Sequence, residues 1–500
     1  MDGTVTTYDI ILIGAGHNSL VAAAYLANAK KKVLILERRD VSGGTLAGDE
    51  PLWPGGQLRP DIIKDLKLTL PRAAEQTPFI SLLGNGDSLL LASDPSKAGE
   101  AIARFSQRDA ARWPEFVRFM DKCARILDTA YSTVMPRLPK NFSLAEGYGL
   151  LELGLELRLA GRKDMLNFIR ALPMTAQELL DEYFESDVVK GAVASVGIHG
   201  STLGPWSAGT GYTLIHNWLN RGGLAHPQTK TSELASALAD TAKKLGVEIR
   251  TNAEVTRILV DNYTVKGVAL ASGEEISARA VLSGVDPKRT FLALVGAVNL
   301  PPEFVWKVQS IKMRGSVAKI RLLTDGNHGL PAGTLVVAPS TNYLERAYDA
   351  AKYGEISEKP YLEVTTSDKV VSIHFQFAPY DLKLETLRQG SGQAWNLKRD
   401  TLETLAVNTL AEHFPNLTSS IINRKSLTPL DLESTYGLTE GDLNHGQLLL
   451  DQFLFMRPMP GWSNHKTPID HLYLCGSGVH GGGGVSGAAG RNAAKVVKAF

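Results

Sequence analysis

The sequence predicts an α/β fold with more than one domain, and three observations carry this prediction. Residues 8–40 alternate apolar β-type runs with a small-residue helix around a pair of glycines. Near the other end of the chain, four consecutive glycines at residues 481–484 separate an apolar run from the last helix. The chain has 500 residues, which is more than one hydrophobic core usually contains.

Composition and charge exclude several classes of protein. Lys and Arg together number 53 and Asp and Glu 52, a formal net charge of +1, so nothing indicates a nucleic-acid partner. Cys123 and Cys475, the only cysteines, stand at no metal-ligand spacing, so we expect no metal site and a reducing compartment. No run reaches the roughly 18 apolar residues of a membrane-spanning helix. The N-terminal "MDGTVTTYD" is no targeting segment, so we expect a cytoplasmic protein.

The first element is a βαβ unit. Residues 10–13 predict a strand, residues 19–30 a helix and residues 33–36 a second strand that leads into Glu37. The turn between the first strand and the helix is Gly14-Ala15-Gly16. This order, with an acidic residue about 20 positions after the turn, is the fingerprint of a dinucleotide-binding unit.

Each residue of the fingerprint has a physical role. Gly14 allows the tight turn, and Gly16 lets the backbone approach a pyrophosphate at the helix N-terminus. Glu37 can accept hydrogen bonds from the ribose hydroxyls. Ser19 replaces the third glycine, and because that position serves close packing of helix on strand, a small serine weakens the pattern without abolishing it.

The stretch after the acidic residue favours FAD over NAD. It reads "ERRDVSGGTLAG" and places Arg38, Gly43 and Gly44 just after Glu37. It resembles the segment that wraps the adenosine and pyrophosphate of FAD in amine-oxidase-like and phytoene-desaturase-like flavoproteins. The resemblance implies FAD as the cofactor.

Two further segments extend this resemblance. Related flavoproteins close the flavin site with a strand, a glycine-rich turn and a helix, here residues 472–475, 476–484 and 485–497. The resemblance places Gly476, Gly484 and Val485 at the flavin, with the glycines letting backbone lie against the flat ring. Residues 243–287 alternate like a small sheet, where related proteins offer backbone groups near Val255 to the adenine.

The whole chain resembles the phytoene-desaturase-related FAD-dependent oxidoreductases, notably in "GPWSAGTGYTLIHN" and "GLTEGDLNHGQLLLDQFLFMRPMPG". The resemblance implies a Rossmann-type FAD-binding domain and a discontinuous α+β substrate domain. We expect residues 1–70, 225–290 and 462–500 in the FAD-binding domain. Residues 71–224 and 291–461 are expected to form the substrate-binding domain.

The chemistry that the resemblance implies is transfer of a hydride from a C–H of an apolar or cyclic small molecule to flavin N5. His480, in the glycine-rich turn, and His445, in "GDLNHG", are the candidate catalytic residues. Each has a structural alternative: His480 as a hydrogen-bond donor to a carbonyl, His445 as a brace for its turn. Asp451 and Arg457 are candidates for a structural ion pair.

Several alternatives stay open at the level of sequence. A flavin-dependent isomerase without net redox change, or a non-catalytic protein that keeps the fold, fits the same motifs. The electron acceptor is unknown, and so is whether the protein forms a homo-oligomer. The helical region of residues 141–184 carries leucines at helical spacing, which favour packing on its own domain, with peripheral membrane contact as the alternative.

Overall fold

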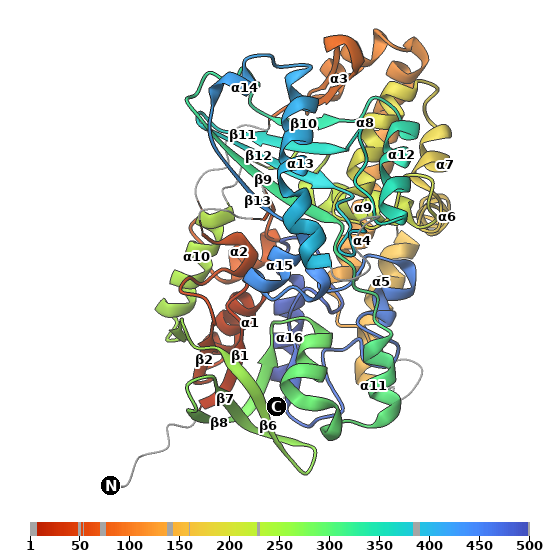
Figure 1. Cartoon of the computed structure of the whole chain (residues 1–500). Coiled ribbons are helices and arrows are strands. Elements are labelled where there is room, and N and C mark those ends of the chain that lie inside the picture. Colours follow the sequence, from red (N-terminus) through yellow and green to blue (C-terminus); the bar gives the residue numbers. More distant parts are fainter. Residues whose placement is uncertain are drawn as a thin grey trace.

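The structure is a computed structural model that describes residues 8–48, 52–53, 55–70, 77–137, 144–159, 161–227, 231–383 and 391–498. Its described strands form two seven-stranded sheets, which lie in the lower and upper halves of Figure 1. The α/β class and the Rossmann-type unit predicted from the sequence are confirmed.

The first sheet has the strand order β5-β2-β1-β8-β7-β6, with β14 also paired to β8. Pairs β1–β2, β1–β8, β2–β5 and β8–β14 are parallel, whereas β6, β7 and β8 form an antiparallel meander. The strands are β1 (Tyr8–Ile13), β2 (Val33–Leu36), β5 (Glu248–Arg250), β6 (Val255–Asp261), β7 (Thr264–Leu270), β8 (Glu275–Ser283) and β14 (Leu472–Leu474). The expected sheet between residues 243 and 287 is therefore present.

Helices that pack close to this sheet include α1 (His17–Asn28), α10 (Thr231–Lys244) and α16 (Ala488–Lys498). Helix α1 begins at His17, two residues before the predicted start at Ser19. Helix α16 begins three residues after the predicted start at Val485, because Gly487 has φ +75° and ends the turn in a left-handed conformation. The glycine-rich turn is thus longer than expected.

The second sheet has the order β13-β9-β12-β11-β10-β3-β4. Its strands are β3 (Phe79–Leu82), β4 (Ser88–Leu91), β9 (Val317–Thr324), β10 (Thr334–Val337), β11 (Leu362–Thr366), β12 (Val370–Gln376) and β13 (Ile421–Leu427). Helix α13 (Ser391–Ala411) shares one apolar cluster with this sheet. A second cluster joins the sheet to α4 (Gln107–Ser132), α8 (Asp187–Ile198), α9 (Thr210–Arg221) and α12 (Thr341–Lys352).

The described part of the protein has further α-helices. They are α2 (Pro60–Asp65), α3 (Pro95–Ala103), α5 (Leu144–Leu159), α6 (Arg162–Ala171), α7 (Ala176–Asp181), α11 (Pro302–Gln309), α14 (Leu417–Ser420) and α15 (Pro429–Tyr436). Between the described termini, no described helix has both the length and the apolar character that a membrane crossing requires.

All strands of the first sheet fall within residues 1–70, 225–290 and 462–500, and all strands of the second within 71–224 and 291–461. We keep this division into two domains as a proposal. Several residues cross it, among them Phe291, Leu294, Phe304 and Met313, which pack in the apolar cluster of the first sheet. The packing therefore extends the first unit beyond the expected boundary at residue 290.

The leucines of the helical region from residue 141 to 184 divide between core and surface. On α5, Leu157 packs against the helical core, whereas Leu151, Leu155 and Leu159 are 71%, 57% and 73% exposed. Residues 141–143 and 160 lie outside the described residues. Packing on its own domain accounts for only part of this apolar stretch, and three leucines at i, i+4 and i+8 face outward.

Candidate functional site

A cavity runs along the carboxyl ends of the first sheet, starting at the turn between β1 and α1. Gly14 has φ +84°, which a residue with a side chain rarely adopts, and its N–H donates to the carbonyl of Leu36 at 2.8 Å. Gly16 is the N-cap of α1, and a Cβ built on it would point into space free of protein atoms. The unpaired N–H groups at the start of α1 therefore have room for an anionic group.

Ser19 lies in the same cavity wall, at the position where the fingerprint usually has its third glycine. A Cβ built on Gly284, just after β8, would lie 2.9 Å from the carbonyl oxygen of Ile13 and still closer to the hydroxyl of Ser19. The glycine that allows close packing here is thus on the strand side of the contact, at residue 284. Ser19 itself contacts Cys475, with Oγ 3.8 Å from Sγ.

The acidic residue after β2 holds the turn together. The carboxylate of Glu37 accepts hydrogen bonds from the N–H of Ala15 at 2.7 Å and of Arg39 at 3.0 Å. Glu37 is buried at the cavity wall, close to the position where the fingerprint places a ribose. The carboxylate is therefore fixed in orientation by the same backbone that forms the turn.

Arg38 and Val255 extend this end of the cavity. Arg38 donates to the carbonyls of Ser434 and Thr435 at 2.9 and 2.7 Å. Val255 is the first residue of strand β6. Gly44 also lines the cavity, but Gly43 does not: its N–H donates to the carbonyl of Ala15 at 2.8 Å, and a Cβ there would meet the side chain of Ala235 at 2.6 Å. Gly43 therefore packs against neighbouring parts of the protein and does not line the cavity.

The four consecutive glycines have different roles from the one expected. Of residues 481–484, only Gly484 lines the cavity, where it is joined by Gly476 and Ser477. A Cβ on Gly481 would lie 2.8 Å from the carbonyl oxygen of Tyr131, and one on Gly483 2.9 Å from Cε1 of His216. Close packing against the protein's own backbone and side chains accounts for most of this cluster. Gly484 is the one of these four that lines the cavity, and a Cβ there would meet the side chain of Asn220 at 2.3 Å.

Val485 lies on the far side of the same turn. It lines a second, smaller pocket together with Gly484, and its side chain occupies the space that a Cβ on Gly56 would need. The structure thus does not place the Val485 side chain in the main cavity.

The two candidate catalytic histidines are in different places. His480 is buried outside the cavity, where Nε2 donates to the carbonyl oxygen of Ala130 at 2.8 Å, and burial lowers its pKa to about 4. This contact is the structural alternative foreseen from the sequence. His445 does line the cavity, and its buried Nδ1 has no hydrogen-bond partner in the described part of the protein. Burial lowers its pKa too.

Arg457 holds the His445 segment, although not through the expected ion pair. It donates to the carbonyls of Asn444, Gly446 and Ser477, while Asp451 pairs with Lys312 at 2.6 Å. The ion-pair prediction is therefore wrong. Arg457 is buried and can satisfy its guanidinium only with the backbone carbonyls that surround it.

His17 is the cavity residue that sequence reasoning missed. It follows Gly16 directly, its Nε2 is buried without a hydrogen-bond partner in the described structure, and burial lowers its pKa to about 4. Its place at the start of α1, one residue after the fingerprint turn, was the available signal. The cavity wall also contains residues that no motif indicated: Arg39, Trp53, Glu254, Val285, Arg289 and Tyr436.

These residues fit FAD. The cavity combines an unfilled approach to a helix N-terminus at Gly16, a fixed carboxylate at Glu37 and two neutral imidazoles, His17 and His445, whose unpartnered nitrogens require a ligand or water. Gly484, the last residue of the glycine cluster, also lines the cavity. Of the residues singled out in the sequence, Gly14, Gly16, Ser19, Glu37, Arg38, Gly44, Val255, His445, Gly476 and Gly484 line this cavity, and Gly43, Val485 and His480 do not.

Comparison with curated proteins gives whole-length relatives. The chain is 32% identical to pyridine nucleotide-disulfide oxidoreductase domain-containing protein 2 of Rattus norvegicus, covering 98% of this chain and 93% of that protein. It is 25% identical to one of the subunits of limonene dehydrogenase from Castellaniella defragrans, covering 98% and 94%. It is also 25% identical to the lycopene-forming phytoene desaturase of Pantoea ananas, covering 96% of each.

Solved structures share the fold. An oxidoreductase from Methanosarcina mazei superposes with a TM-score of 0.60 at 15% identity, covering 99% of this chain and 100% of that chain. A variant of putrescine oxidase gives 0.58 at 14% identity, covering 99% and 98%.

Family models assign the chain. Residues 12–60 match the NAD(P)-binding Rossmann-like domain, and residues 52–498 match the flavin containing amine oxidoreductase family. The second match covers nearly the whole chain, including the second sheet and the closing turn. The chain thus belongs to the flavin containing amine oxidoreductase family and is an FAD-dependent oxidoreductase.

Proposed function

We propose that this oxidoreductase removes two hydrogens from an apolar or cyclic small molecule, one of them as a hydride from a C–H group. The observation that carries the proposal is the composition of part of the cavity wall. Trp53, Leu438 and Leu443, which share one apolar cluster, line the cavity together with His17 and His445, both buried histidines. This part of the wall is neutral and largely apolar, which suits a substrate without charge.

Two relatives support the substrate class. They are named for limonene and phytoene, both hydrocarbons. Bound FAD supplies a two-electron acceptor for such chemistry. This chain's residues would bind and orient it: the N-terminus of α1 would hold the pyrophosphate, Glu37 would bind the ribose, and the turn at Gly476 and Gly484 would form another part of the wall.

The cofactor site is tested by one substitution that the protein itself tolerates. Gly16 has φ −66° and ψ 164°, which valine adopts readily, and no protein atom lies within 4 Å of its Cβ position. Gly16→Val should therefore leave the melting temperature nearly unchanged and abolish flavin binding, because the side chain occupies the space of the pyrophosphate. The matched control is Gly84→Val, which also meets no protein atom but lies on the surface.

The reaction is tested by mixing the flavin-loaded protein anaerobically with a panel of terpenes, carotenoid precursors and cyclic amines. Bleaching of the flavin, followed by turnover with an added electron acceptor, supports the proposal. An isomerised product without consumption of acceptor would identify the isomerase alternative. A protein that cannot be loaded with FAD would leave only the non-catalytic alternative.

A further inference from the structure

A small second pocket lies behind the glycine-rich turn. Trp53 and Gly484 line both this pocket and the flavin cavity, so the two spaces share a wall. On its other side the small pocket is lined by His199, Arg221 and His226. Arg221 ends α9, and His226 lies in the segment that follows it. Neither these two residues nor His199 lines the flavin cavity described above.

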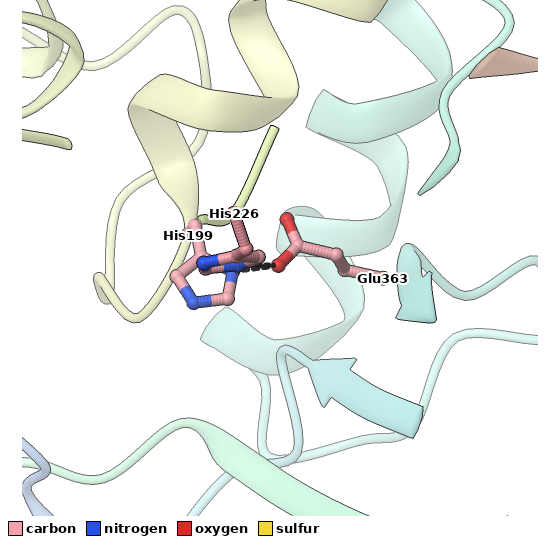
Figure 2. Close-up of side chains that lie close together, drawn as sticks. All are labelled: His199, His226 and Glu363. Atoms are coloured by element: carbon pink, nitrogen blue, oxygen red, sulfur yellow. Dashed lines mark hydrogen bonds and ion pairs between the residues drawn. The ribbon is translucent and has the colours of Figure 1, made fainter. Parts of the chain in front are cut away.

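Glu363 ties the three polar residues together, and Figure 2 shows its carboxylate with the two imidazoles. One oxygen, Oε1, lies 2.5 Å from Nε2 of His226 and 3.2 Å from Nδ1 of His199. The other, Oε2, accepts from Nη2 of Arg221 at 3.0 Å and from the hydroxyl of Tyr361 at 3.3 Å. His199 follows α8, Arg221 ends α9, and Glu363 lies in β11. All of these side chains are buried.

The protonation of this cluster follows from its contacts. Burial opposes the charge of Glu363, but Arg221 and the imidazoles outweigh it and hold the pKa of that carboxyl well below its usual value. An ionised carboxylate only accepts, so Nε2 of His226 carries the hydrogen. Burial lowers the pKa of His226 to about 4 and of His199 to about 3, so both rings are neutral near pH 7.

Each neutral ring therefore has a nitrogen that the protein does not use. Nδ1 of His226 bears a lone pair, is buried and has no hydrogen-bond partner among the described residues. Nδ1 and Nε2 of His199 are both buried and, within the same described residues, have no hydrogen-bond partner. Because native proteins rarely leave such atoms unsatisfied, they indicate a ligand or water in the small pocket.

A metal ion is the competing occupant, because two imidazoles and a carboxylate within 4.8 Å of one another are a known ligand set. The positively charged side chains around this site disfavour binding of a metal ion. Arg221 already pairs with the one carboxylate, and Lys319, with Nζ 2.9 Å from Nδ1 of His374, lies in the same group, where burial lowers its pKa to about 7. His374 stacks on His199 with ring centroids 4.0 Å apart. A divalent cation would add two positive charges beside Arg221, more than the one carboxylate can compensate, whereas a proton adds only one.

We infer that His226, held by Glu363 and flanked by His199, is the proton acceptor on the substrate side of the flavin site. The inference rests on the proposed function. As the substrate gives up a hydride to the flavin, a second hydrogen leaves as a proton to Nδ1 of His226, and the electron pair of the broken bond forms the new double bond. Glu363 then stabilises the imidazolium, as a carboxylate does for a catalytic histidine.

The experiment compares the flavin-loaded wild type with His226→Gln, and uses His413→Gln as control. His413 is a partly exposed histidine near the end of α13, outside both pockets. Three quantities are measured: flavin content, metal content, and the nitrogen-15 NMR signals of labelled histidine rings at pH 7, with His226 assigned from the variant. Substrates found by flavin bleaching are then used to measure the rate constant of flavin reduction.

We expect full flavin content in all three proteins, no stoichiometric metal, and a neutral His226 ring with an unprotonated Nδ1. Loss of a general base typically lowers the rate about 10²–10⁴-fold, so His226→Gln should reduce the flavin that much more slowly, and His413→Gln at the wild-type rate. Unchanged reduction in His226→Gln, a ring doubly protonated at pH 7, or one metal ion per chain that the variant loses overturns this inference alone. A wild type that holds no flavin overturns the proposed function as well.

Discussion

Replacing Gly490 with alanine tests whether close contact between two helices builds the flavin site. Gly490 lies in α16, and a Cβ built there would lie 2.8 Å from the carbonyl carbon of Asn18 in α1 and closer still to its oxygen. Real Cβ atoms do not approach backbone this closely, so α16 must move away from α1. The glycine N–H also lies 3.3 Å from the side-chain oxygen of Asn18.

The expected magnitude combines two opposing effects. Alanine favours a helix over glycine by about 1 kcal/mol. Overpacking against rigid backbone costs about 1–3 kcal/mol and occasionally more. We therefore expect Gly490→Ala to lower the free energy of unfolding by up to about 2 kcal/mol, the difference between these two effects. Flavin affinity should fall with it, because α1 and the turn before α16 form opposite walls of the site.

The assay is thermal unfolding of the flavin-free and flavin-loaded protein, together with flavin titration. Gly154→Ala is the matched control, since Gly154 is also inside a helix, α5, but its Cβ position meets no protein atom. That variant should be stabilised by up to about 1 kcal/mol. If Gly490→Ala raises the melting temperature as much as Gly154→Ala does, the close contact between α1 and α16 is not what this glycine provides.

Three further predictions follow from the same structure. Glu37→Gln removes a charge that accepts two backbone hydrogen bonds, each worth about 1.5–3 kcal/mol, so flavin affinity measured by titration should fall at least about tenfold, and an unchanged affinity would contradict the role of Glu37. The free energy of unfolding should fall as the pH drops below about 6.5, the ordinary pKa of histidine, because the unfolded chain then binds protons that the folded chain does not bind. Urea unfolding at pH 7.5 and 5.0 measures this difference, and equal stability at the two pH values would refute it. The histidines responsible are buried, with pKa values of about 3 or 4: His17, His199, His216, His226, His465 and His480. If the exposed face of α5 contacts membranes, Leu155→Glu should reduce flotation of the protein with phospholipid vesicles without changing the melting temperature. Val298→Glu, at a residue that is 92% exposed, should leave flotation unchanged. Equal flotation of all proteins would exclude the contact.

The sequence by itself determined the parts of the fold that are local. The fingerprint turn at Gly14 and Gly16, strand β2 and the acidic residue after it follow from short-range periodicity and glycine placement, and the structure has them at or within two residues of the expected positions. Residue types with only a few physical uses, such as glycine at positive φ, make such motifs readable without a fold.

Tertiary structure decided what the same residue types do at a distance. All four glycines at residues 481–484 pack closely against protein, and only contacts with residues such as Tyr131 and His216 show this. His480 is turned to a carbonyl in α4, whereas His17 and His445, 428 positions apart, share a cavity wall. The cluster of His199, His226 and Glu363 joins three separate elements and leaves no pattern in the sequence. Burial and partners, which set the charge of an imidazole, are properties of the packed chain, and no local motif encodes them.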